Sequence, residues 1–122
     1  MAFTSTFTIT VNAVAKILNR INQDNYGSEY LLREALQEFR MKVRHSKQKP
    51  AKAGARDLDR HNLEITQTIF AVGDVLEIVR TVYLVYTVPY NDDLTQATYL
   101  AAAFGTVANN ATVQSDLMTW QN

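Results

Sequence analysis

The chain has 122 residues, 47% of them hydrophobic and 20% charged, and its formal net charge is zero. A chain of this length and composition is expected to form one globular domain with a modest core, which excludes a disordered or fibrous protein. It contains no cysteine, which excludes a disulfide framework, a thiolate metal site and a thiol nucleophile. No apolar run reaches the length of a membrane helix, and residues 1–6 lack the features of a signal peptide. We therefore expect no membrane partner and a protein that acts where it is made.

The first predicted element is an N-terminal β-hairpin. Residues 3–11 alternate between apolar side chains and threonines, which is typical of a strand. Asn12-Ala13 fits a tight turn, after which residues 14–21 return antiparallel with Ile17 and Ile21 on one face. The same returning segment also fits the spacing of a short helix, and we favour the hairpin.

Two further strands are predicted over residues 28–34 and 39–47, after a polar turn at 22–27. The second alternates with period two, so its side chains are expected to point to opposite faces of a sheet. The apolar face consists of Phe39, Met41 and Val43, and the other face of Arg40, Lys42, Arg44 and Ser46. A row of cations on one sheet face is favourable when it binds an anion such as phosphate. The pattern is equally typical of a solvated edge strand that its cations protect from pairing.

Two more strands follow the loop that begins at residue 47. Residues 60–70 place Leu63, Ile65 and Ile69 on one face, and the opposite face consists of Asn62, Glu64, Thr66 and Thr68. Residues 78–88 form the most apolar strand, which predicts a central or covered position, although Arg80 interrupts its apolar face. Between these strands lies an apolar connection, Val72, Gly73, Asp74, Val75 and Leu76, which suggests a contact with another subunit.

The period then changes to that of helices. Asn91-Asp92-Asp93 predicts an N-cap and an acidic first turn. An apolar stripe from Leu94 to Ala108 predicts one helix, Asn109-Asn110 breaks it, and residues 112–120 predict a second helix ending at Trp120. The fold class is therefore α+β, one domain over 1–122 with a hairpin (1–22), an antiparallel sheet (26–90) and two C-terminal helices (91–122).

Charge is concentrated in one stretch of this balanced chain. Eight of the 12 Lys and Arg residues lie between positions 40 and 60, opposed there only by Asp57 and Asp59. A concentrated basic block indicates a surface that binds a polyanion. On this face Glu64 is expected to pair with Lys42 or Arg44, and Tyr83 either stacks a base or fills the sheet surface.

A single copy is not expected to cover its own sheet. Two short helices are too few for a sheet of this width, and the strand over 78–88 needs cover or a neighbouring strand. The economical solution is a symmetric dimer in which sheets join edge to edge and helices cross onto the partner. A monomer with a partly exposed sheet is the alternative.

Catalytic and metal sites find no support. His45 and Ser46 point to opposite faces of a strand, and no acid is spaced to complete a triad. His45 and His61 show no metal-site spacing, and the acids at 74, 77, 92 and 93 are better explained as capping or solvated groups than as calcium ligands. We expect no enzyme activity, no cofactor and no metal.

Several strand motifs together resemble one family. Arg20-Ile21-Asn22-Gln23-Asp24, Ser28-Glu29-Tyr30, the segments 39–45 and 60–62, and Glu64, Thr66 and Thr68 are similar to the coat proteins of single-stranded RNA bacteriophages (leviviruses), most closely the Caulobacter-phage type. The resemblance is dense from about residue 18 to 90 and weak at the hairpin and the helices. Compared with enterobacterial members, this chain has more cations on the strand and a longer loop at 47–59.

The resemblance implies a capsid protein of the virion, assembled in the bacterial cytoplasm. It implies a homodimer that closes into an icosahedral shell of T=3 type, packages viral single-stranded RNA, represses translation through an RNA hairpin in many members, and meets a maturation protein. The residues it places against RNA are Arg40, Lys42, Arg44, Ser46, Asn62, Glu64, Thr66, Thr81 and Tyr83. It places the loop Val72–Leu76 at the fivefold and quasi-sixfold axes. A small cellular dimer that binds RNA through a basic sheet, without forming shells, is the alternative from another class.

Overall fold

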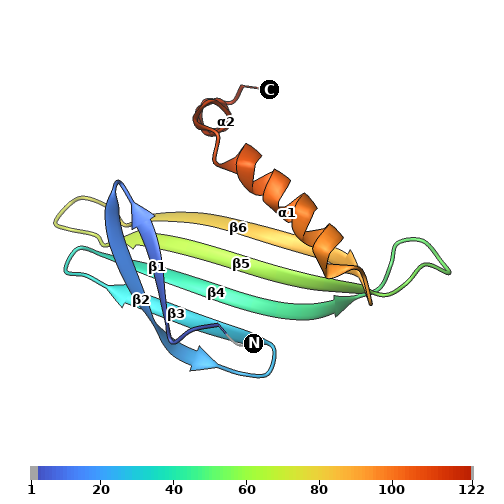
Figure 1. The fold of residues 1–122 in the computed structure, drawn as a ribbon. Helices are drawn as coiled ribbons and strands as arrows, with labels where there is room; N and C mark the ends of the chain where they lie inside the picture. The colour runs from blue at the N-terminus through green and yellow to red at the C-terminus, as the bar shows by residue number, and fades with distance from the viewer. Residues whose placement is uncertain (1–2, 122) are drawn as a thin grey trace. The chain divides into compact units, whose positions relative to one another are not determined.

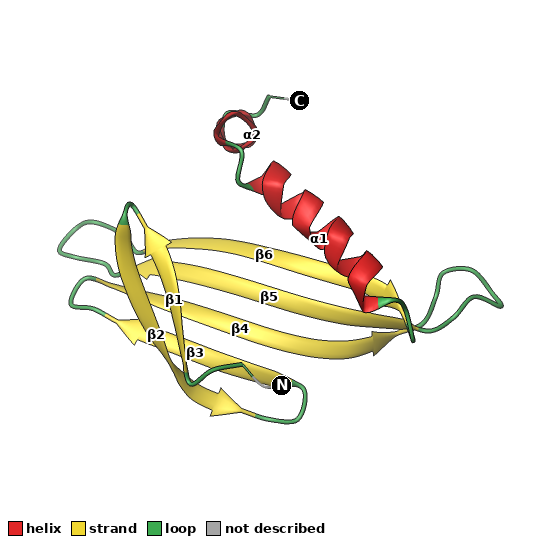
Figure 2. Cartoon of the chain, viewed as in Figure 1, coloured by secondary structure: helices red, strands yellow, loops and turns green. Residues whose placement is uncertain are grey.

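The computed structural model describes residues 3–121, which form two compact units divided between Thr87 and Val88. The strands are β1 (Thr6–Val11), β2 (Val14–Gln23), β3 (Gly27–Arg33), β4 (Gln37–Gln48), β5 (Leu58–Ile69) and β6 (Ile78–Pro89). The helices are α1 (Leu94–Ala108) and α2 (Ala111–Met118). Six antiparallel strands followed by two helices confirm the predicted α+β class (Figures 1 and 2).

The strands lie in the sheet in chain order, β1-β2-β3-β4-β5-β6. Asn12 and Ala13 both have positive φ, 50° and 62°, which is the backbone of the tight turn that joins two twisted antiparallel strands. Val11 and Val14 are paired directly across it. The hairpin is therefore confirmed, and the alternative of a short helix over 14–21 is wrong.

The core lies on one face of the sheet, under the hairpin. Its buried members are Leu18, Tyr30, Phe39, Met41 and Val43. Side chains of β1 pack against this cluster, and the rings of Phe7 and Tyr30 meet edge to face with centroids 6.1 Å apart. On β2 the inward side chain is Leu18, whereas Ile17 and Ile21 lie outward and are half exposed.

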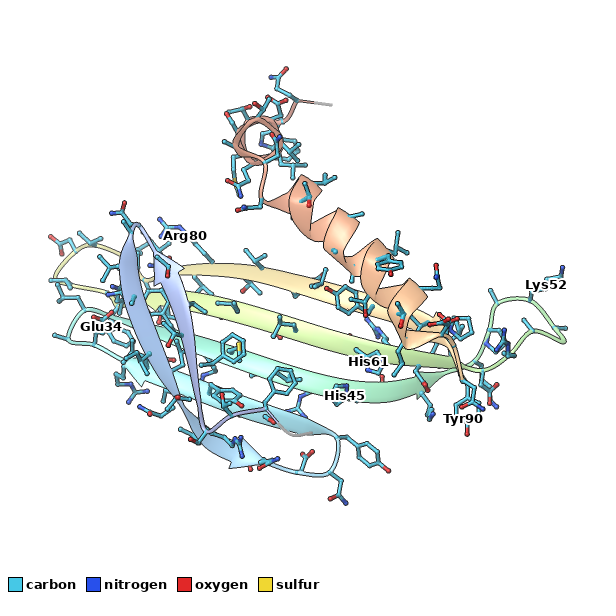
Figure 3. The ribbon with its side chains drawn as sticks, in the orientation of Figure 1. Glu34, His45, Lys52, His61, Arg80 and Tyr90 are labelled. Carbon is cyan, nitrogen blue, oxygen red and sulfur yellow. The ribbon has the colours of Figure 1, made fainter. Side chains whose placement is uncertain are left out.

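A series of side-chain hydrogen bonds links the strands at the far end of this apolar face. It explains how Arg80 can interrupt the apolar face of β6. Arg80 Nη1 donates to Gln67 Oε1 (3.1 Å), and Gln67 Nε2 donates to Gln37 Oε1 (2.9 Å). Gln37 Nε2 in turn donates to Glu34 Oε1 (3.1 Å), which also accepts from Lys16 Nζ (2.9 Å). Because each polar group has a partner, these side chains can lie beside apolar neighbours. Glu34 and Arg80 are labelled in Figure 3.

Strand β6 is an edge strand of this sheet. The sequence predicted a central or covered strand, yet most residues of β6 are exposed on both faces, including Val79, Val82 and Tyr83. Among the described residues nothing pairs with the outer edge of β6, so one chain does not supply the cover or neighbouring strand that the sequence predicted, and the prediction stays with the dimer. A long apolar edge of this kind is a template for pairing with another chain.

The helical unit is built as its caps predict. The Asp93 carboxylate accepts from the backbone N–H groups of Thr95 and Gln96, and Asn110 caps α2 in the same way. Two details differ from expectation: Asp92 and Asp93 precede the first turn of α1 and do not lie in it, and α2 ends at Met118, so Trp120 lies outside it. Trp120 has a positive φ of 65°, which is incompatible with helix. No helix among the described residues has the length and apolarity to cross a membrane.

Candidate nucleic-acid interface

The predicted site residues on β4 lie on the face opposite the core. Phe39, Met41 and Val43 are at most 4% exposed. The residues between and beyond them, Arg40, Lys42, Arg44 and Ser46, are half-buried or exposed. The burial of alternate residues therefore confirms the period-two pattern, because successive side chains of a strand point to opposite faces.

The β4–β5 register brings the predicted residues of both strands together. Arg40 lies opposite Thr66, Lys42 opposite Glu64, and Arg44 opposite Asn62. Directly opposed residues of antiparallel strands share a face. We call this surface the polar face. It continues onto β6, because Thr81 Oγ1 lies 3.5 Å from Thr66 Oγ1. Tyr83, two residues further along, is 69% exposed.

Arg60 also lies on this face, although it was not among the predicted site residues. The register pairs Arg60 with Ser46, which places its side chain on the polar face beside Arg44. The signal was present in the sequence, since Arg60 has the same parity as Asn62, Glu64 and Thr66. Arg60 was placed at the start of the predicted strand over 60–70 and counted in the basic block, but it was left out of the set of RNA-facing residues.

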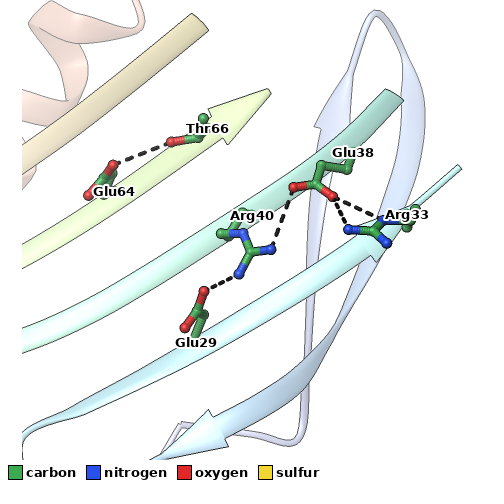
Figure 4. Close-up of polar contacts among 6 residues, drawn as sticks. All are labelled: Glu29, Arg33, Glu38, Arg40, Glu64 and Thr66. Atoms are coloured by element: carbon green, nitrogen blue, oxygen red, sulfur yellow. Dashed lines mark hydrogen bonds and ion pairs between the residues drawn. The ribbon is translucent and has the colours of Figure 1, made fainter. Parts of the chain in front are cut away.

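Four charged side chains at one end of the polar face form an ion-pair network (Figure 4). Arg40 Nη1 pairs with Glu29 Oε1, and Arg40 Nη2 lies 3.5 Å from Glu38 Oε1. Arg33 Nη2 donates to Glu38 Oε2 at 2.9 Å. The hydrogen bond from Arg33 lowers the pKa of Glu38, although burial opposes it, and the bond to Glu29 raises the pKa of Arg40. These shifts indicate that the network favours the charged forms.

Glu64 does not take the partner that was expected. Its carboxylate accepts a hydrogen bond from Thr66 Oγ1 at 3.3 Å (Figure 4), and among the described residues it has no ion pair with Lys42 or Arg44. The prediction of such a pair is wrong, because the short hydroxyl on its own strand is the nearer donor. Beside it, Asn62 Oδ1 is buried and has no hydrogen-bond partner.

The cations of the polar face therefore fall into two groups. Arg33 and Arg40 have carboxylate partners. In the described part of the chain, the side chains of Lys42, Arg44 and Arg60 have no ion pair. Beyond the face, the loop cation Lys49 pairs with Asp57 at 3.3 Å, and Lys47 pairs with Asp59 at 2.5 Å.

The two histidines meet on the opposite side of the sheet. His45 and His61 are paired across β4 and β5, with their Nδ1 atoms 2.8 Å apart (Figure 3). Sequence spacing did not anticipate this contact, which only the register creates. No group of three or more potential metal-ligating side chains was found among residues 3–121.

The predicted inter-subunit loop is exposed. Val72 and Val75 bridge each other through two backbone hydrogen bonds, of 3.1 and 2.9 Å. Gly73 adopts a positive φ of 57° at the turn, and the Asp74 carboxylate takes part in none of the ion pairs of the described chain. Leu76 is 82% exposed. An exposed apolar turn of this kind is suited to contact with another molecule.

Comparison with known proteins identifies both a family and a fold. A family model described as "Phage phiCb5, coat protein" matches residues 4–89. Among solved structures, the chain is similar to the virus-like particle of Beihai levi-like virus 21, with a TM-score of 0.75, 13% identity, and coverage of 99% of this chain and 98% of that chain. It is also similar to the virus-like particle of bacteriophage ESE058, with a TM-score of 0.71, 11% identity and 98% coverage of both chains. No curated protein matches the chain by sequence.

Proposed function

The chain belongs to the phage phiCb5 coat protein family, and from this premise we propose that it pairs into dimers which close into an icosahedral shell around single-stranded RNA. As a coat protein it is a structural component of the virion and not an enzyme. The match over residues 4–89 carries this proposal, because it spans every strand of the sheet.

The unpaired edge of β6 supports a dimer. This strand has 12 residues and carries exposed apolar side chains, among them Val82, which is 72% exposed. Joining two such edges satisfies backbone groups and buries apolar area, each buried CH₂ contributing about 0.8 kcal/mol. No residue of α1 or α2 is buried. We infer that the helices pack onto the partner's sheet, so that the two units work as one coat-protein domain, 1–122, within the dimer.

The polar face supports the RNA contact. Among the described residues its side chains Lys42, Arg44 and Arg60 take part in no ion pair, and cations of this kind can bind phosphates with the release of condensed counterions. Tyr83 is exposed on the same face and offers a ring on which a base can stack. Contacts of this kind favour packaging of any single strand over reading one hairpin, because phosphate contacts carry no sequence information. Stacking on Tyr83 is likewise tolerant of base identity, so these contacts do not by themselves select the hairpin that repression of translation requires.

Expression in bacteria followed by size-exclusion chromatography tests the function directly. We expect a void-volume peak that absorbs as nucleic acid and protein together and whose RNA resists nuclease. A small species without nucleic acid, in the presence of abundant cellular RNA, contradicts the packaging shell.

Reversal of two cations tests the role of the polar face. Lys42 and Arg44 both lie outside the core, although Lys42→Glu places a carboxylate opposite Glu29 and Glu64. We therefore expect Lys42→Glu with Arg44→Glu to keep the core of the sheet with a lowered melting temperature, and to abolish nuclease-protected RNA. Arg40 is left intact so that its ion pairs remain. The control is Lys49→Glu with Lys52→Glu in the exposed loop, which changes the net charge equally. Normal RNA content in the first variant, or equal loss in both, refutes the assignment of this face.

A further inference from the structure

We propose that RNA phosphates bind at one end of the polar face, on Arg44 and Arg60, and that Arg40 is a positioning residue whose charge is held by carboxylates. The proposal rests on the proposed packaging of single-stranded RNA and names the part of the face that binds it. The cations that alternate along β4 look equivalent in the sequence, and the proposal assigns them different roles.

At the end of the face around Arg40, the cations are neutralised by ion pairs with carboxylates. Arg40 contacts Glu29 and Glu38, and Arg33 contacts Glu38, so two cations face two carboxylates. The carboxylates are well shielded, with side chains only 18% and 12% exposed. A phosphate that binds Arg40 must displace Glu29 and leave that half-buried charge without its partner, which costs free energy. This exchange of one anion for another gives little net gain.

The middle of the face is also balanced in charge. Lys42 lies between Glu29 on β3 and Glu64 on β5, directly opposite both in the register. Each of these carboxylates bonds elsewhere, to Arg40 and to Thr66. Their charges nevertheless lie across from Lys42 and repel an approaching phosphate.

At the end of the face around Arg44, the cations lie opposite uncharged residues. The cross-strand neighbours of Arg44 are Gly27 on β3 and Asn62 on β5, neither of which is charged. Arg60 lies opposite Ser46, so Arg44 and Arg60 are diagonal neighbours. The backbone positions of diagonal neighbours in a sheet are roughly 7–8 Å apart, which long side chains can span. Neither guanidinium has an ion pair among residues 3–121.

Glu29 and Glu64 are also diagonal neighbours of Arg44, but each bonds elsewhere, to Arg40 and to Thr66. Arg60 lies on the side of Arg44 away from both carboxylates, so positive potential is greatest at this end.

Gly27 keeps this end open. A Cβ at position 27 would lie 3.4 Å from Cγ and 3.5 Å from Nη1 of Arg44, so the Arg44 side chain runs over the bare backbone of β3. No side chain on β3 therefore stands between this guanidinium and a ligand. Guanidinium groups bind phosphate with two parallel hydrogen bonds, which suits a backbone contact.

The test is the salt dependence of RNA binding. A fluorescently labelled oligouridine is titrated with the full-length chain over a series of NaCl concentrations, and log K is plotted against log salt. We expect Arg44→Gln and Arg60→Gln each to reduce the slope by about 0.7 for every chain that contacts the strand. We expect Arg40→Gln to keep the wild-type slope and to lower the melting temperature, because it leaves Glu29 without its partner.

Three further variants give the controls. Lys52→Gln removes a loop cation and is expected to leave the slope unchanged. Tyr83→Ala removes no charge, so it is expected to weaken binding at every salt concentration with the slope unchanged. Glu29→Gln releases Arg40 without removing a cation and is expected to steepen the slope, which keeps the proposal testable if Arg40→Gln fails to fold.

The outcomes separate the two proposals. A slope for Arg40→Gln reduced as much as that for Arg44→Gln overturns the division of the face, as does an unchanged slope for Glu29→Gln. Equal reductions in Lys52→Gln and Arg44→Gln show general attraction and overturn it as well. If the wild-type chain binds no RNA, the proposed function itself fails.

Discussion

At the scale of single residues, partners decide which charges are available. Arg40 and Arg44 are two positions apart on one strand and have the same side chain. Arg40 contacts two carboxylates, whereas Arg44 lies between a glycine and an asparagine. The available charge of the polar face therefore depends on cross-strand neighbours and not on the number of cations.

The Arg33–Glu38 contact predicts an acid-dependent loss of stability. The pKa of Glu38 is lowered in the folded chain, chiefly by the hydrogen bond from Arg33. A lowered folded pKa contributes stability above the unfolded carboxyl value of about 4.3, and this contribution is lost as the pH falls through the folded value. We expect Glu38→Gln to lower the melting temperature at neutral pH, with the difference from wild type vanishing in acid.

Thermal melts across this pH range make the comparison. Glu64→Gln is the matched control, because it removes a carboxylate on the same face that lies outside the ion-pair network. A deficit for Glu38→Gln that persists unchanged in acid contradicts an ionic origin.

At the scale of elements, the backbones of β3 and β4 approach so closely at Gly27 that no side chain fits between them. Gly27 begins β3 and lies opposite Arg44. A Cβ at this position would lie 2.7 Å from the carbonyl oxygen of Val43, which is backbone and cannot turn aside. Glycine is needed here for space, since its φ is not in the positive range that otherwise favours this residue.

Substitution of Gly27 tests this requirement. We expect Gly27→Ala to force the strands apart and to destabilise the chain by about 1–3 kcal/mol, as overpacking does. Gly105 in α1 is the control, since a Cβ there meets nothing within 4 Å. Gly105→Ala is expected to be neutral or stabilising, because alanine is favoured over glycine within a helix. Equal melting temperatures for the two variants argue against a steric role for Gly27.

At the scale of the whole molecule, apolar side chains are exposed on both units of the chain. Among residues 3–121 the core holds five buried hydrophobic residues, all from β2, β3 and β4. The exposed hydrophobic residues lie largely on β6, on α1 and around Trp120, which is 94% exposed. This distribution is typical of a subunit whose second hydrophobic core forms only with a partner.

A charge on β6 tests the dimer. We expect Val82→Lys to prevent pairing, because it places an ammonium group in the apolar interface, and to leave the core of β2, β3 and β4 intact. Analytical ultracentrifugation gives the subunit count. Leu36→Lys is the control, since Leu36 is similarly exposed, at 65%, in the turn between β3 and β4. A Val82→Lys chain that still forms dimers and shells excludes β6 from the interface.

The secondary-structure elements and their order could be predicted from the sequence. Alternation of apolar and polar residues depends only on neighbouring positions, so the six strands, the turn at Asn12-Ala13 and the cap at Asp93 were all predictable. The strand motifs between about residues 18 and 90 indicated the coat-protein family, which the family match confirms. The period also assigned the cations of β4 to the face opposite the core, which burial confirms.

Contacts between strands were decided only by the tertiary structure. The register places Arg60 on the polar face and His45 opposite His61, and it brings Glu29 diagonally within reach of Arg40. None of these contacts is between residues close in sequence. The bond of Glu64 to Thr66 likewise contradicted expectation. Sequence period specifies which face a side chain takes, because that is a property of one strand. Its partners depend on how strands slide against one another, which the whole sheet and its core settle together.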